Sequence, residues 1–157
     1  ILLLNFKTLY SKGLQALIAV NIRLGIESLN AEQLSVVEYQ GANSLSGIVF
    51  HICEHVDRHI QRYRNQDIQF NRGIEDYFPN REFEVQELTA YIESLFRSWG
   101  QEIDRAANID MHSLYHLIEH TGYHLGQIVD RTRRLTEKEF RFCQHGINER
   151  ALREGIG

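Results

Sequence analysis

Proline occurs only once in this chain of 157 residues, at Pro79. Proline removes a backbone N–H and fixes the backbone angle φ, so it interrupts a helix wherever it stands in the helix interior. With a single proline, nearly the whole chain is free to be helical, whereas an all-β domain of this size usually carries many more turn-breaking residues. The sequence therefore predicts an all-α protein.

Four long segments repeat apolar residues at intervals of three and four, which is the spacing of the buried face of a helix. Polar side chains at 43–46 and at Asp110 stand where two of these segments begin, as helix-capping residues do. The polar stretch 66–83 predicts one long loop. We expect helices at about 4–29, from the capping run 43–46 to about 65, at 83–107 and at 111–135, packed as a four-helix bundle.

The composition is that of one folded domain, with 43% hydrophobic and 24% charged residues. We expect a single domain over residues 1–157, with a polar C-terminal tail at about 137–157. The two cysteines, Cys53 and Cys143, are far apart and form no Cys-x-x-Cys pair, which predicts a reducing, cytoplasmic environment. Cys53 is expected to be a buried structural thiol rather than a nucleophile.

Charge and hydropathy argue against two classes of partner. The formal net charge is -4 and the longest basic run covers only 131–134, so nucleic acid is a poor candidate. The apolar opening at 1–4 is too short to span a bilayer and has no charged segment before it. We therefore expect no nucleic-acid partner, no signal peptide and no membrane anchor.

Histidine is the most informative residue type, because seven of the eight histidines fall at a strict spacing of four within two of the predicted helices. The two series are His51, His55 and His59, and His112, His116, His120 and His124. Residues four apart lie one above the other on a helix face, so neighbouring imidazoles can bind one metal ion together. Each step of four also rotates by about 40° around the helix axis, so only part of each series can face the core.

Three neutral imidazoles with open positions left over suit Zn²⁺, Ni²⁺ or Fe²⁺, and such a site activates water or another nucleophile. The inverted zinc-protease motif His-x-x-Glu-His occurs at 51–55 and 116–120, but the histidine series produce it as a by-product. A di-iron bundle needs Glu-x-x-His, which does not occur in the sequence. Haem held by two histidines, and histidines with no metal at all, stay open as alternatives.

Two runs of residues carry a resemblance to a known family. Residues 43–51, which lead into an amphipathic helix, and the run His-Thr-Gly-Tyr-His-Leu-Gly-Gln at 120–127 resemble the DinB-like (DinB/YfiT) superfamily of bacterial metal-dependent enzymes. The resemblance also covers 30–34 and 81–83, so it spans most of the chain. It implies a four-helix bundle whose metal is held by one histidine of the second helix and a His-x-x-x-His pair of the fourth.

Carried over position by position, the implied metal ligands are His51, His120 and His124. Members of the superfamily include thiol-dependent S-transferases, a mycothiol-dependent isomerase and hydrolases, so the resemblance implies a site without implying one reaction. This chain departs from the pattern in having histidines one helical turn from two implied ligands, at His55 and His116. Either can become a further ligand or support one.

We therefore expect a divalent metal that activates water or a low-molecular-weight thiol for transfer to, or hydrolysis of, a small molecule. The candidate proton acceptors are Glu54, Glu119 and His55, and the residues placed to orient ligand or substrate are Tyr123 and Gln127.

The alternative of another class is a non-catalytic metal-binding or structural helical bundle. A homodimer is expected in either case, by analogy. The aromatic side chains of the long loop, Phe70, Tyr77 and Phe78, are candidates for a partner surface or for a simple cover over the end of the bundle.

Overall fold

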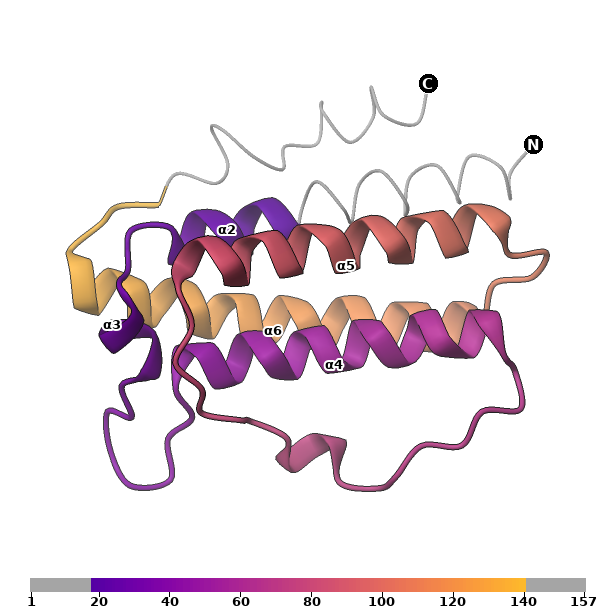
Figure 1. Ribbon diagram of the computed structural model, residues 1–157, viewed down its shortest axis with the longest axis horizontal. Helices are drawn as coiled ribbons and strands as arrows, with labels where there is room; N and C mark the ends of the chain where they lie inside the picture. The colour runs from indigo at the N-terminus through magenta and orange to yellow at the C-terminus, as the bar shows by residue number, and fades with distance from the viewer. Residues whose placement is uncertain (1–17, 141–157) are drawn as a thin grey trace.

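The computed structural model describes residues 18–140 (Figure 1). The described part is all-helical and contains no strand, which confirms the all-α prediction. Its elements are α2 (Val20–Ile26), α3 (Ala31–Ser35), α4 (Leu45–Arg64), the short 3-10 helix η2 (Ile74–Asp76), α5 (Val85–Arg105) and α6 (Met111–Thr136). The first part of the predicted helix 4–29, Cys143 and most of the polar tail lie outside the described residues.

The three long helices, α4, α5 and α6, run alongside one another, and α4 contacts both of the others. It packs against both α5 and α6, while α2 packs against α6. The connection between α4 and α5 is the predicted long loop, and Figure 1 shows it returning along the outer side of α4. This return brings η2 into contact with α4, opposite the side where α5 packs.

Capping side chains fix where the helices begin. The Ser44 hydroxyl accepts a hydrogen bond from the backbone N–H of Gly47 at 3.1 Å, and the Asp110 carboxylate accepts from the backbone N–H groups of His112 and Ser113. Both satisfy donors that the first turn of a helix leaves free, as the sequence predicts.

The short helix α3 is not among the predicted elements. It is held by a capping box, in which Asn30 and Gln33 each bond the backbone N–H of the other. Leu34 is its one buried residue. A single apolar position gives no periodicity, so the only sequence signal for this helix is its capping pair, Asn30 and Gln33.

The core is apolar and is built largely from α4 and α5, with smaller contributions from α2 and α6. Trp99 and Phe96 of α5 pack edge to face and are almost fully buried. Cys53 of α4 lies in the same core with 1% exposure, and burial, followed by the nearby Asp57 carboxylate, raises the pKa of its thiol. The thiol is therefore protonated at neutral pH, in agreement with its expected structural role.

Between residues 18 and 140, no helix is both long enough and apolar enough to cross a membrane.

The helical glycines differ in how closely other atoms approach them. At Gly25 of α2, an added Cβ would lie 2.9 Å from Cγ2 of the buried Ile128 on α6, so this glycine allows the two helices to pack closely. At Gly122 and Gly126 of α6, no described atom lies within 4 Å of the same position. Glycines inside a helix often mark close packing, but at these two positions the described structure leaves the space open.

This difference predicts opposite effects for the same substitution. Gly126→Ala should raise the free energy of unfolding by about 0.5–1 kcal/mol, because alanine is the better helix former and no neighbour has to move. Gly25→Ala should lower it by about 1–3 kcal/mol through overpacking against Ile128. Urea denaturation of the two variants beside wild type measures both, and equal effects at the two positions would contradict the close α2–α6 contact.

Candidate metal centre

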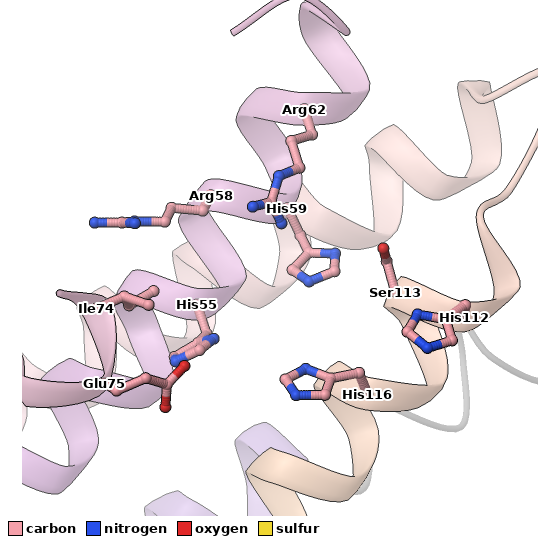
Figure 2. Close-up of a pocket in the computed structure, with 9 residues that line it drawn as sticks. All are labelled: His55, Arg58, His59, Arg62, Ile74, Glu75, His112, Ser113 and His116. Carbon is pink, nitrogen blue, oxygen red and sulfur yellow. The ribbon is translucent and has the colours of Figure 1, made fainter. Parts of the chain in front are cut away.

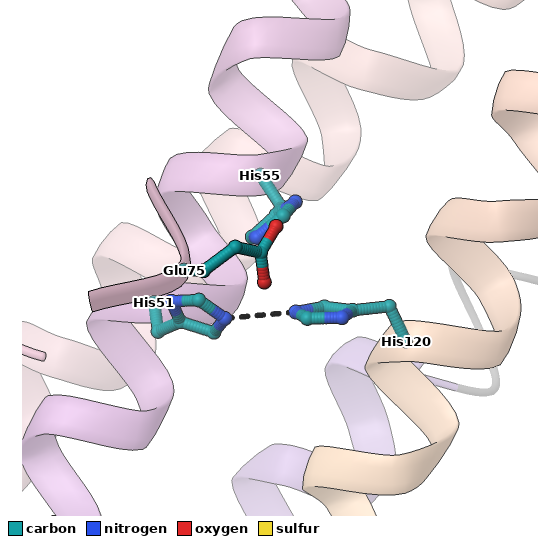
Figure 3. Close-up of side chains that lie close together, drawn as sticks. All are labelled: His51, His55, Glu75 and His120. Atoms are coloured by element: carbon teal, nitrogen blue, oxygen red, sulfur yellow. Dashed lines mark hydrogen bonds between the residues drawn. The ribbon is translucent and has the colours of Figure 1, made fainter. Parts of the chain in front are cut away.

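Three histidines from the two series and one loop glutamate come together between α4 and α6. His51 and His55 come from α4, His120 from α6 and Glu75 from η2 (Figure 3). One ligand atom from each of the four lies within 4.8 Å of the others. We call these four residues the metal group.

The spacing of four along α4 produces half of this arrangement. It places His51 and His55 one above the other on one face of the helix, where their rings meet edge to face with centres 4.6 Å apart. His120 meets them from α6, with its Nε2 2.8 Å from Nε2 of His51 and its ring centre 4.1 Å from that of His55. Because α4 packs against α6, histidines of the two series meet in a single cluster.

Glu75 reaches the histidines because the long loop places η2 against α4. The residue before η2, Gly73, has φ of 96°, a left-handed conformation that glycine adopts without strain. Glu75 itself is exposed. Sequence analysis does not single it out, because a glutamate in a polar loop carries no spacing signal, and only the chain reversal after Gly73 brings it to the histidines.

Hydrogen bonds orient two imidazoles. Nδ1 of His51 donates to the backbone carbonyl of Tyr77 at 3.2 Å, and the ring stacks on Phe78 with centres 4.1 Å apart. Nδ1 of His124 donates to Oε1 of Gln127 at 2.9 Å. An Nδ1 that donates leaves Nε2 with its lone pair, and such bonds commonly fix the orientation of metal-binding histidines.

The sequence-predicted ligands His51, His120 and His124 lie side by side. The ring of His124 is centred 4.8 Å from that of His51 and 4.5 Å from that of His120. The metal group shares His51 and His120 with the predicted set, and it contains His55 and Glu75 in place of His124. Gln127, which orients His124, donates in turn to the hydroxyl of Tyr123 at 3.1 Å.

The donor chemistry of these residues fits a divalent metal. Burial, followed by the neighbouring imidazoles, lowers the pKa of His55 to about 3 and that of His120 to about 4. Burial also lowers the pKa of His51 and of His124. The rings are therefore neutral at pH 7 and present lone pairs. Nε2 of His55 is buried and has no hydrogen-bond partner in the described part of the chain, and a metal ion bound to this nitrogen would satisfy it.

One pair of candidate ligands is already close to the spacing that zinc needs. Two imidazole nitrogens on one tetrahedral zinc, each at about 2.0–2.1 Å, lie about 3.3 Å from each other. The two Nε2 atoms of His51 and His120 stand at 2.8 Å, so the rings must separate slightly.

The remaining sequence-predicted residues lie outside the metal group. Glu54 pairs with Arg58 at 2.8 Å, and Glu119 is exposed on α6. His116 is exposed and stacks on His120, with ring centres 5.9 Å apart. His59, which has polar sequence neighbours, is nevertheless buried, with 6% of its surface exposed.

A cavity of about 310 Å³ opens beside the metal group (Figure 2). His55 and Glu75 line it, so two members of the metal group also form part of its wall. This volume is at the lower end of the range for sites that bind small molecules. A small ligand in the cavity can therefore reach the metal group.

Comparisons of the chain with protein-family models, with curated proteins and with solved structures find no match.

The lowered pKa values predict how the stability of the metal-free protein depends on pH. Histidines in the unfolded chain titrate near 6.5, whereas His55 and His59 in the folded chain titrate at about 3 and about 4. Between pH 6.5 and about 4 these two histidines are therefore protonated in the unfolded state and largely neutral in the folded state. The free energy of unfolding should fall by about 1.4 kcal/mol per pH unit for each such histidine as the pH drops toward 4.5.

Urea denaturation in the presence of EDTA between pH 7 and 4.5 measures this slope. His59→Gln should reduce it, while Ile60→Val, which removes a buried methylene without removing a titrating group, should keep it. A pH-independent stability in wild type would contradict the burial of neutral imidazoles.

Proposed function

We propose that this chain is a metal-dependent enzyme with the four-helix-bundle fold of the DinB-like superfamily. A divalent ion between α4 and α6 would serve to activate water or a low-molecular-weight thiol for hydrolysis or transfer on a small molecule. The observation that carries the proposal is the convergence of neutral, oriented imidazoles from two helices beside a cavity. The cytoplasmic location and the homodimer remain expectations of the same proposal.

His51 and His120 would hold the ion in either ligand set. We take His124 as the third ligand, because Gln127 fixes its ring with Nε2 free and because the resemblance carries it to this position. Three imidazoles leave coordination positions open, as in catalytic sites. When bound, a divalent metal lowers the pKa of water toward 7 and deprotonates a thiol, which supplies a nucleophile at neutral pH.

With the ion on these three histidines, His55 and Glu75 are the groups left to accept a proton. Both line the cavity and lie within 4.8 Å of His51 and His120. His55 is a poor acceptor, because burial and the adjacent imidazoles lower its pKa to about 3, and this leaves the Glu75 carboxylate as our candidate. Glu54 is tied to Arg58 and Glu119 is not part of the cavity wall.

A second candidate function rests on the metal group itself. His51, His55, His120 and Glu75 offer four ligand atoms, which is a complete tetrahedral set. A closed set of four is typical of structural metal sites, so a non-catalytic metal-binding bundle is the alternative. The two candidates differ in whether Glu75 and His55 are ligands.

The proposal predicts one zinc ion per chain after dialysis without chelator. His120→Ala should lose the ion, because His120 belongs to both ligand sets. His116→Ala is the matched control: it removes an exposed imidazole one turn away on the same helix and should keep the ion. Elemental analysis gives the stoichiometry, and full metal content in His120→Ala would refute the site.

Two further variants separate the enzyme from the structural bundle. If His124 is the third ligand, His124→Ala should weaken zinc affinity by about 10-fold or more, while Glu75→Gln should keep zinc and lower turnover by about 10²–10⁴-fold. Competition with a chromogenic chelator measures affinity, and zinc-dependent hydrolysis of 4-nitrophenyl acetate or thiol transfer to 1-chloro-2,4-dinitrobenzene measures turnover. Loss of zinc in Glu75→Gln with retention in His124→Ala would favour the closed set.

A further inference from the structure

The cavity beside the metal group continues along the α4–α6 seam. A second cavity, of about 370 Å³, shares three lining residues with the first: His59, Arg62 and Ser113. Figure 2 shows His55 and Glu75 at one end of the first cavity and Arg62 and Ser113 toward the other. We call the two cavities together the seam groove.

The two arginines of the seam groove differ in their partners. Arg58 is occupied, because its Nε donates to Glu54 at 2.8 Å and its NH1 donates to the backbone carbonyl of Asn71 at 3.0 Å. For Arg62 no carboxylate of the described chain lies within ion-pair distance, and its guanidinium stands 5.2 Å over the ring of Phe70. Stacking on an aromatic face leaves the in-plane N–H groups of a guanidinium free to donate.

One carboxylate of the groove lining, Asp110, already accepts several hydrogen bonds. Asp110 accepts from the backbone N–H groups of His112 and Ser113 and from the Ser113 hydroxyl at 2.6 Å. It thereby caps α6, and these bonds lower its pKa. The other carboxylate in the lining, Glu75, stands at the metal group. In the described chain neither carboxylate of the lining forms an ion pair with Arg62, so the guanidinium stays available to a ligand in the seam groove.

We propose that the substrate of this site is a small organic anion, whose carboxylate or phosphate binds Arg62 while its reacting group lies at the metal group. This inference rests on the proposed function for the reacting end and on Arg62 alone for the anionic end. A guanidinium with free in-plane donors binds either oxyanion in a bidentate manner. His59, which lines both cavities together with Arg62, can donate a ring N–H to the same anion.

The test is calorimetric titration of the zinc-loaded full chain with inorganic phosphate and with succinate, at one fixed ionic strength. Wild type should bind one of the two, and the one that it binds identifies the anionic group. Arg62→Gln should weaken that binding at least tenfold and leave the zinc content unchanged. Arg97→Gln is the matched control, since it removes the same charge from an exposed position on α5 outside the groove and should bind like wild type.

Two outcomes would overturn the inference. One is that zinc-loaded wild type binds neither anion, and the other is that Arg62→Gln binds the anion as tightly as wild type, as it would if the anion bound only to zinc. The same titration of the metal-free chain keeps the two proposals distinguishable. Anion binding that depends on Arg62 in a chain that takes up no zinc would support the anion site while refuting the metal-dependent function.

Discussion

Imidazole rings from α4 and α6 face one another across the helix seam at ring distances of 4.1–4.9 Å, and they cannot all carry charge there. Burial and mutual repulsion both favour the neutral form of each ring. The Nε2 atoms of His51 and His120 are joined by a hydrogen bond of 2.8 Å, whereas the buried Nε2 of His55 has no hydrogen-bond partner in the described part of the chain. The seam is thus a place where the fold presents donors for a metal ion rather than one where it gains stability.

The stability of the protein comes from the apolar core, which offsets the cost of burying these imidazoles. Ile48, Ile52 and Val56 of α4 are buried, and they pack with Trp99 and Phe96 of α5 into one cluster. One helix therefore has two functions: one face joins the core and the adjacent face presents His51 and His55. The loop that returns along α4 adds a carbonyl, a stacked ring and a carboxylate to the same cluster, through Tyr77, Phe78 and Glu75.

Much of this could be predicted from the sequence, because the long helices repeat their apolar positions and carry clear caps. The predicted helices at 83–107 and 111–135 correspond to Val85–Arg105 and Met111–Thr136. The rotation of about 40° per step of four also anticipates that the histidines differ in burial, as His51 and His112 do. Helix α3, with one buried residue, and Glu75, in an aperiodic loop, could not be predicted, since their places depend on how the chain folds back. The burial of His59 likewise depends on what packs over it rather than on its polar sequence neighbours.

The central claim is that the two histidine series form one metal centre at the α4–α6 seam. A crystal structure of the zinc-loaded chain, with anomalous data collected at the zinc absorption edge, tests it most directly. The account predicts one strong anomalous peak between the helices, at about 2.0–2.1 Å from the Nε2 atoms of His51 and His120. A zinc-loaded crystal with no peak there, or with its peak on other side chains while His51 and His120 stay in mutual contact, would contradict the account.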